Sequence, residues 1–311
     1  MKTKLNSYQT WSGRVAATAI ALLACGAQAG GRPDAQSWLD NLISPVANPI
    51  YFEDPRVFNE LRPIYMYHTL PSTFRFDGGS VDLDGNVQVV ALQARLALTD
   101  RLALIATKDG YIWTNPDDTL DNESGWADIA AGFKYVLLDD RKNRFILTPG
   151  FTFTIPVGCE KVFQGNGSGE WNVFVSAAKG FESAENLHVM ANTGFRIPNN
   201  FDDQTAQWHY SLQLDYFVCD WFIPFVVMNG YTILSDGDNE LLGAVPLNTE
   251  LYDLGNFGST EAKGTTQMAA GGGFRSKLTK NLDFGIAYEW AVITPKGIFD
   301  TRLTTDLSIH W

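Results

Sequence analysis

From about residue 61 to its end, the chain alternates hydrophobic and polar residues in segments of roughly ten, each closed by turn residues. A period of two is typical of β-strands that have one apolar and one polar face. Such segments lie at 61–70, 87–98, 102–113, 126–138, 145–156, 172–182, 187–198, 208–219, 221–235, 265–277, 281–293 and 299–311. The pattern predicts an all-β fold with twelve antiparallel strands.

The connections between these segments alternate in length. Short connections lie at 99–101, 139–143, 183–186, 219–220 and 279–280, and long polar ones at 114–125, 157–171, 199–207 and 236–264. Short turns on one rim and long loops on the other are typical of bacterial outer-membrane barrels. The sequence therefore predicts a single transmembrane β-barrel in the outer membrane of a Gram-negative bacterium, with both chain ends on the periplasmic side.

Successive strand residues point to opposite faces, so parity assigns the oily face to lipid and the polar face to the lumen. The reverse assignment would cost about 2–4 kcal/mol for a cation near the membrane midplane. The faces of 102–113 and 221–235 stay open, because adjacent Lys108 and Asp109 need a bulge near Gly110 and 221–235 is apolar on both sides. The expected lumen-lining residues are Arg95, Asp128, Lys134, Arg196, His209, Asp215, Arg275, Asp283, Glu289, Arg302 and Asp306.

Seven tryptophans fall at predicted strand ends, where a membrane barrel places its aromatic girdles. They are Trp113, Trp126, Trp171, Trp208 and Trp290 at the loop ends, with Trp221 and Trp311 at the turn ends. The last strand finishes on Trp311, which resembles the terminal aromatic signal by which such barrels are recognised for insertion. We therefore expect the barrel-assembly machinery, membrane lipid and lipopolysaccharide as partners.

The chain before the barrel has two parts. Residues 1–29 have the layout of a signal peptide, with basic residues, a short apolar run and the small-residue site Ala27-Gln28-Ala29. The residues before Cys25 faintly resemble a lipoprotein cleavage box. Residues 30–60 are expected to form either a periplasmic segment or a plug in the lumen, and residues 61–311 the barrel.

Charge and cysteine content narrow the possible functions. Removal of residues 1–29 takes away three of the 23 basic residues and no acidic one, which leaves 20 against 35 and a net charge of −15. An acidic chain binds nucleic acid poorly. Cys159 and Cys219 fall at opposite ends of the predicted barrel, so no disulfide is expected between them.

The expected lumen carries five basic and five acidic side chains, which gives no strong preference for either ion sign. Turns near residues 279 and 296 place Arg275 opposite Asp283 and Glu289 opposite Arg302, so both pairs are expected to bond across strands. These pairs would stabilise the barrel wall by linking neighbouring strands, rather than line a solute path.

Enzyme and metal chemistry find little support in the sequence. The histidines His68, His188, His209 and His310 fall on separated strands, whereas a metal needs several donors at one point. The pair His209 and Ser211 resembles the active-site strand of outer-membrane phospholipase A, but it faces the lumen and has no evident third group. We expect no cofactor, no metal and no enzymatic activity, and we interpret the acidic run 236–240 as solvated surface.

Several motifs in the middle of the chain resemble one family of barrels. They are Gly125-Trp126-Ala127-Asp128-Ile129, Gly132-Phe133-Lys134-Tyr135, Pro149-Gly150, Ile155-Pro156-Val157-Gly158 and Asn192-Thr193-Gly194. Over residues 125–200 the chain is similar to the outer-membrane family labelled "MetA-pathway of phenol degradation", in which Gly and Thr more usually stand at the places of Ala127 and Val157. The resemblance implies a transporter for small organic, including aromatic, molecules.

The expected function is therefore an outer-membrane channel or transporter for the passive uptake of small, aromatic or hydrophobic solutes. A structural or adhesion barrel with a closed lumen is the first alternative, and it would use the long stretch 236–264. An outer-membrane lipolytic enzyme is the second.

Overall fold

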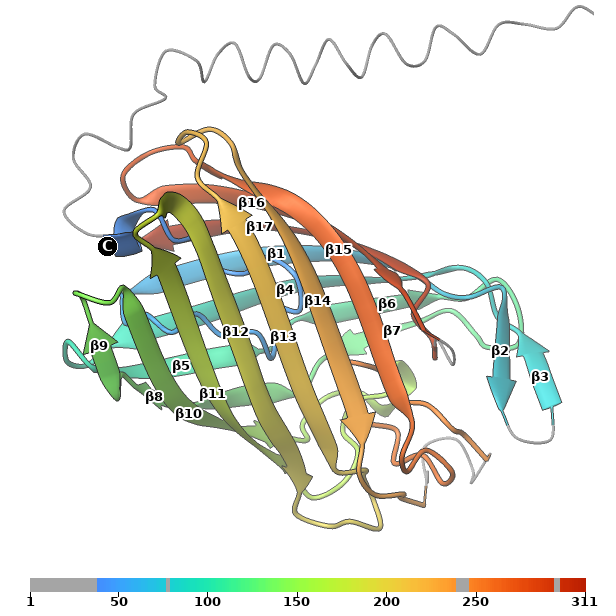
Figure 1. Ribbon diagram of the computed structural model, residues 1–311. Coiled ribbons are helices and arrows are strands. Elements are labelled where there is room, and N and C mark those ends of the chain that lie inside the picture. Colours follow the sequence, from blue (N-terminus) through green and yellow to red (C-terminus); the bar gives the residue numbers. More distant parts are fainter. Residues whose placement is uncertain (1–37, 77–78, 239–245, 294–296) are drawn as a thin grey trace, which may run out of the picture.

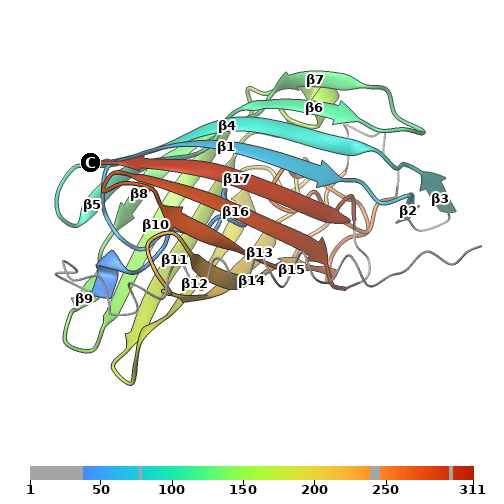
Figure 2. The same cartoon turned by 90° about the horizontal axis from the view of Figure 1, so that it is seen from above.

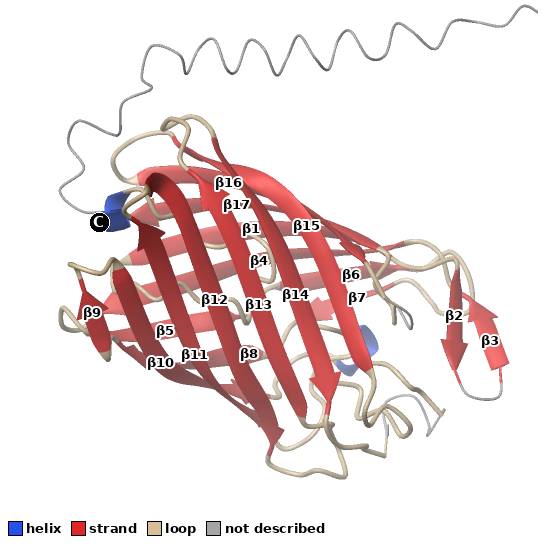
Figure 3. Ribbon diagram, viewed as in Figure 1, coloured by secondary structure: helices blue, strands red, loops and turns tan. Residues whose placement is uncertain are grey.

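The computed structural model describes residues 38–76, 79–238, 246–293 and 297–311, which form a closed antiparallel β-barrel (Figures 1 and 3). The predicted signal peptide, residues 1–29, and the box before Cys25 lie outside the described residues. None of the helices in the described ranges is long and apolar enough to cross a membrane.

The wall follows the chain in order. Its strands are β1 (Glu60–Thr69), β4 (Asn86–Ala97), β5 (Leu102–Lys108) with β6 (Tyr111–Asn115), β7 (Glu123–Trp126) with β8 (Ile129–Tyr135), β10 (Phe145–Ile155), β11 (Glu170–Phe181), β12 (Ala184–Pro198), β13 (Gln207–Tyr216), β14 (Ile223–Ile233), β15 (Thr266–Lys277), β16 (Leu282–Ala291) and β17 (Thr301–His310). The first strand pairs with the last, which closes the barrel (Figure 2). Because β5 with β6, and β7 with β8, each fill one position, the described wall has the twelve positions that the alternation predicts.

The remaining elements are short. They are the 3₁₀ turns η1 (Trp38–Asp40) and η2 (Glu160–Val162), the hairpin of β2 (Thr73–Phe76) and β3 (Gly79–Asp82), and β9 (Leu138–Asp140). The hairpin and η2 lie at the end of the barrel that carries the long loops, whereas η1 and β9 lie at the opposite end (Figure 1).

The break between β5 and β6 is the bulge predicted near Gly110. The register of β5 against β8 shifts between Ala106 and Lys108, and Gly110 has a φ of +119°, which suits glycine. Lys108 is buried in the lumen, while Asp109 turns away and accepts a bond from the Leu92 backbone N–H at 2.8 Å. The two adjacent charges therefore do not share one face.

The barrel is oily outside and polar inside. Leu214 and Leu307 are exposed by 41% and 39%, whereas their neighbours Asp215 and Asp306 are exposed by only 1% and 3%. All seven predicted girdle tryptophans lie exposed on the exterior. An apolar exterior around buried charges is stable only in hydrocarbon, and a closed antiparallel barrel of this kind lies in the bacterial outer membrane.

Strand β14, whose faces the sequence leaves open, follows the same parity. Phe225, Asn229 and Tyr231 point inward and are buried, whereas Val226 and Met228 are exposed on the lipid face. The apolar inward side chains of this strand pack against residues that precede β1. A strand that is apolar on both faces therefore marks the part of the wall that contacts a filled lumen.

Residues 38–59, which we call the lumenal segment, lie inside the barrel. Leu42, Val46 and Phe52 are exposed by 1% or less and share a core with inward residues of β14. The segment runs from the turn end towards the middle of the lumen and returns to begin β1, and Asn48 near its tip has a left-handed φ of 49°. A barrel of twelve strands is wider than the eight at which wall side chains alone fill the interior, so a folded segment fits.

Candidate functional site: the lumen and its outer cavity

Wall cations clamp the lumenal segment at Glu53. Arg95 donates from Nε and Nη2 to the two carboxylate oxygens at 2.8 and 2.7 Å, and Lys134 Nζ lies 2.7 Å from Oε1. Burial alone would raise the pKa of Glu53, but Arg95 and Lys134 lower it from 4.5 to about 2. Glu53 is therefore ionised at neutral pH and holds the segment against β4 and β8.

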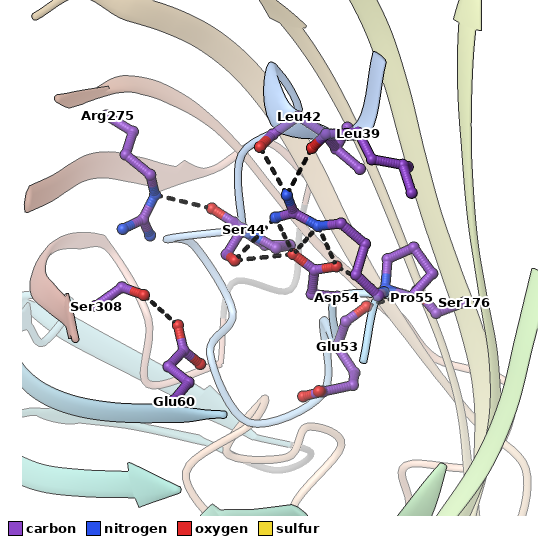
Figure 4. A network of polar contacts seen from close by, with 12 residues as sticks. Leu39, Leu42, Ser44, Glu53, Asp54, Pro55, Glu60, Ser176, Arg275 and Ser308 are labelled. Atoms are coloured by element: carbon purple, nitrogen blue, oxygen red, sulfur yellow. Dashed lines mark hydrogen bonds and ion pairs between the residues drawn. The ribbon is translucent and has the colours of Figure 1, made fainter. Parts of the chain in front are cut away.

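The backbone of the lumenal segment also bonds to the wall. Its carbonyl groups have no strand partner, so buried donors must satisfy them. Arg275 Nε reaches the Ser44 carbonyl at 3.1 Å, Gln93 the Pro49 carbonyl at 2.8 Å and Thr148 the Pro55 carbonyl at 2.6 Å. Figure 4 shows Ser44, Asp54 and Pro55 within this network.

Arg56 links two parts of the lumenal segment to each other. Its guanidinium group pairs with Asp54 at 2.6 Å and donates to the carbonyl groups of Leu39 and Leu42, which lie on the descending part of the segment. The descending and returning parts are thereby cross-linked, and the segment is a folded unit rather than a loose tether.

A second segment enters the lumen from the other end. Residues 246–265, which we call the outer loop, follow the end of β14 and include buried Leu251, Tyr252 and Phe257. Arg196 Nη1 donates to the Tyr252 carbonyl at 2.9 Å, and Arg302 Nη1 lies 2.6 Å from Asp253 Oδ1.

Glu250 organises the outer loop from inside. Its two oxygens accept bonds from the backbone N–H groups of Phe257 and Ser259 and from the Thr205 hydroxyl. Burial nevertheless raises the pKa of Glu250, because the backbone donors offset only part of the desolvation cost. The loop has a defined internal structure and closes the lumen opposite the lumenal segment.

Between the outer loop and the rim lies an apolar cavity of about 420 Å³, which we call the outer cavity. Its wall combines the β2–β3 hairpin region, the residues that follow β1 and β6, the η2 turn and the outer loop. The apolar lining residues are Leu70, Phe74, Val81, Leu83, Val87, Ile112, Leu120, Val162, Phe163, Leu247, Leu251, Leu254, Phe257 and Ile298. The overall polarity of 236–264 predicts a solvated loop rather than this site, although four of the lining residues lie there.

The motifs at Asp128 and Gly158 shape one side of the outer cavity. Asp128 Oδ1 accepts bonds from the backbone N–H groups of Gly158 and Gly165 at 3.0 and 2.8 Å, and Lys108 Nζ lies 3.5 Å from Oδ2. These bonds hold the turn that contains Val162 and Gln164, both cavity residues. A single carboxylate therefore fixes the loop that follows β10.

The predicted lumen residues lie on the inner face. Arg95, Asp128, Lys134, Arg196, His209, Asp215, Arg275, Glu289, Arg302 and Asp306 are buried, and Asp283 is partly buried at the periplasmic mouth, in a polar vestibule of about 690 Å³. The structure divides them between contacts to the lumenal segment, contacts to the outer loop and contacts within the wall. They therefore do not converge on a single site.

One of the two predicted cross-strand ion pairs is correct. Glu289 lies opposite Arg302, with Oε2 and Nη2 2.9 Å apart. The pair of Arg275 with Asp283 was wrong, because the turn is centred one residue later than expected and Lys277 stands opposite Asp283. Arg275 pairs with Asp306 at 2.9 Å instead.

Residues singled out for enzyme or metal chemistry are held in structural contacts. His209 Nε2 bonds to Asn172 at 2.7 Å, and the Ser211 hydroxyl accepts a bond from Asn48 of the lumenal segment. Among the described residues no group of three or more His, Cys, Asp or Glu side chains could hold a metal ion. Cys159 has a free thiol, so it is not bonded to Cys219, as expected.

Comparison with known proteins assigns the chain to a family. A model of the family described as "MetA-pathway of phenol degradation" matches residues 59–300. The chain belongs to this family. The matched range covers the whole barrel up to the start of β17 and includes the motifs around Asp128 and Gly158. No curated protein matches the chain.

Solved structures with a similar fold are outer-membrane barrels. The COG4313 outer membrane channel from Pseudomonas putida F1 has a TM-score of 0.57 at 16% identity, over 87% of this chain and 100% of that one. The NanC porin has a TM-score of 0.48 at 9% identity over 81% and 98%, and the TodX monoaromatic hydrocarbon channel 0.42 at 9% over 85% and 93%. The first of these similarities supports the fold of this family member.

Proposed function

We propose that this protein is a passive route for neutral, apolar solutes, which bind first in the outer cavity. The cavity is the observation that carries the proposal, because fourteen of its 21 lining residues are Leu, Val, Ile or Phe. Ligand sites are concave, mainly apolar and of roughly 300–1,000 Å³, and this cavity of about 420 Å³ falls in that range. Family membership agrees with a role in handling organic molecules.

The cavity volume favours solutes larger than one aromatic ring. A cavity of about 150 Å³ accommodates benzene. The outer cavity is nearly three times larger, so one ring would leave much of its surface uncovered. Each additional apolar group that covers this surface adds roughly 25 cal/mol per Å², which favours fused-ring or long-chain solutes.

The filled lumen argues against a permanently open aqueous pore. The lumenal segment enters from one end and the outer loop from the other, and side chains of both, Glu53 and Asp253, bond to the same wall. A solute therefore needs a movement of one or both to pass. The same filling favours the alternative of a structural barrel with a closed lumen, and solute binding separates the two.

Binding of N-phenyl-1-naphthylamine, a fluorescent fused-ring amine, tests the proposal. The full chain in lipid nanodiscs is expected to bind it above the level of empty nanodiscs. Leu254→Glu places a charge in the cavity and Val162→Trp fills it, so both should lower binding at least tenfold. Phe201→Glu, at an exposed residue of the loop between β12 and β13 and away from the lining, is the matched control and should bind normally. Equal binding by all four proteins would contradict the proposal.

A further inference from the structure

One wall ion pair touches both segments that fill the lumen. Glu170 at the start of β11 and Arg196 near the end of β12 lie side by side, with Oε1 and Nε 2.8 Å apart. Both side chains are at most 3% exposed. Neither is needed to align the strands, because the backbone register of β11 and β12 is continuous there. The remaining carboxylate and guanidinium atoms of the pair can therefore bond to segments outside the wall.

The lumenal segment reaches this pair through Tyr51. The Tyr51 hydroxyl donates to Glu170 Oε1 at 3.3 Å, and the Arg196 guanidinium carbon stands 4.8 Å from the centre of the Tyr51 ring. The ring also packs against His209 at 5.0 Å. The tip of the segment is thus attached to the pair by a hydrogen bond and a cation–π contact.

The outer loop reaches the same pair from the opposite side. Arg196 donates to the carbonyl groups of Tyr252 and Gly255 at 2.9 and 3.3 Å, and Asn256 donates to Glu170 Oε2 at 2.9 Å. Glu170 therefore accepts from the segment with one oxygen and from the loop with the other.

Aromatic rings connect the two segments a second time. Tyr51 packs on Tyr231 of β14 with ring centres 6.3 Å apart, and Tyr231 packs on Tyr252 of the outer loop at 5.5 Å. Tyr252 then contacts Phe299 at 4.8 Å. This row of rings crosses the lumen beside the outer cavity, whose lining residues Leu251 and Leu254 flank Tyr252 in the chain.

Tyr252 is held in a costly conformation. Its φ of 56° is left-handed, which is rare for a bulky residue, and its buried hydroxyl has no hydrogen-bond partner among the described residues. Strain of this kind persists only where the surroundings impose it and often marks a movable part. The bond from Arg196 to the Tyr252 carbonyl is one of the contacts that impose it.

We infer that Glu170 and Arg196 form a shared latch that couples the outer loop to the lumenal segment. Movement of the loop breaks its bonds to the latch, frees the latch side chains and loosens Tyr51, so that both ends of the lumen open together. The coupling is reciprocal, as any coupling between two binding equilibria must be. The trigger, a solute that displaces Leu251 and Leu254 from the cavity, rests on the proposed function, but the latch itself does not.

Hydrogen exchange of the full chain in lipid nanodiscs tests the latch without any solute. Asp253→Asn weakens a bond that only the loop makes, to Arg302. It should speed exchange in residues 249–257 and also, about tenfold, in residues 48–53. Tyr51→Phe, which removes only the hydroxyl bond to Glu170, should speed exchange in residues 252–256. Glu170→Gln should loosen both regions.

The control is Thr148→Val, which removes a bond to the lumenal segment at Pro55, away from the latch. It should speed exchange around Pro55 and leave the outer loop unchanged. In a Glu170→Gln background, Asp253→Asn should no longer alter residues 48–53. If Asp253→Asn, in a chain that keeps Glu170, speeds exchange only in the outer loop and not in residues 48–53, the latch is contradicted. Tyr51→Phe and Asp253→Asn keep the test decisive if Glu170→Gln does not fold.

Discussion

Arg275 of β15 reaches Asp306 of β17 across Gly285 of the strand between them, with Nη2 2.9 Å from Oδ2. The crossing is possible because glycine leaves the inner face of β16 empty at that point. A Cβ atom on Gly285 would lie 2.6 Å from Asp306 Oδ1 and 2.6 Å from a methyl group of Val46, which belongs to the lumenal segment. One glycine thus makes room for both an ion pair and the segment.

Replacement of this glycine should loosen the segment. Gly285→Val is expected to displace Val46 and to speed digestion of the full chain by trypsin at Arg56 several-fold, because the segment then spends more time outside its binding site. Gly272→Ala is the control, since a Cβ there meets only one backbone oxygen closer than 3.0 Å, at 2.9 Å, and the residue does not face the segment. Equal digestion of both variants would contradict this account of Gly285.

Because Arg95 and Lys134 hold Glu53, the single substitution Glu53→Gln should strongly increase opening of the barrel. Glu53→Gln keeps the side-chain shape but leaves Lys134 without its carboxylate partner in a buried site. Removal of one partner from a buried pair typically costs about 3–5 kcal/mol. The variant should show frequent openings in planar bilayers, whereas Glu185→Gln, at an exposed turn pair with Arg144, should behave as the original protein does.

The same clamp gives a pH dependence with a definite sign. The pKa of Glu53 is lowered from 4.5 to about 2, so the ionised form stabilises the bound segment above pH 4.5, and this contribution is lost as pH falls towards 2. The groups that face Glu53 are Arg95, Lys134 and, through Arg95, Glu60. Bilayer recordings should show closed protein from neutral pH to about 4.5 and increasing openings below it. A Glu53→Gln protein should lack most of this dependence.

The lipid-facing wall predicts depth-dependent stability. Leu212 lies at the middle of β13 and is 47% exposed on the apolar face. Leu212→Arg should lower the free energy of unfolding in lipid bilayers by about 2–4 kcal/mol. Trp208→Arg, on the same face of that strand but at its girdle end, should cost less than about 1 kcal/mol in charge placement, in addition to the lost ring. Similar results for arginine at both depths would argue against hydrocarbon around β13.

The period-two alternation predicted the barrel wall, because the residues of a single strand are enough to tell its lumenal face from its lipid face. The pairing of Glu289 with Arg302 followed from simple counting across a hairpin. The partner of Arg275 did not, since Asp306 lies two strands away and is reached only because Gly285, on the strand between them, has no side chain. Parity shows which way a side chain points, but not which neighbour it reaches.

The contents of the lumen were harder to predict. Glu53 and Tyr51 precede the alternating region, and their partners Arg95 and Glu170 lie 42 and 119 residues away. Such contacts depend on the fold of an irregular segment, for which no periodic pattern exists. The run 247–257 did carry a signal, because Leu247, Leu251, Leu254 and Phe257 are unusually apolar for a solvated loop.

Conductance of single molecules in planar bilayers, for the full chain and for a chain that lacks residues 30–58, tests most directly that a folded segment closes a membrane barrel. The full chain should pass few ions. The shortened chain should give larger, regular steps, because removal of Tyr51 also loosens the outer loop through the latch. It should prefer anions, because Lys134 loses Glu53 while Arg62 and Arg275 lose the carbonyl groups of the segment. Equal conductance from the two chains would contradict the account.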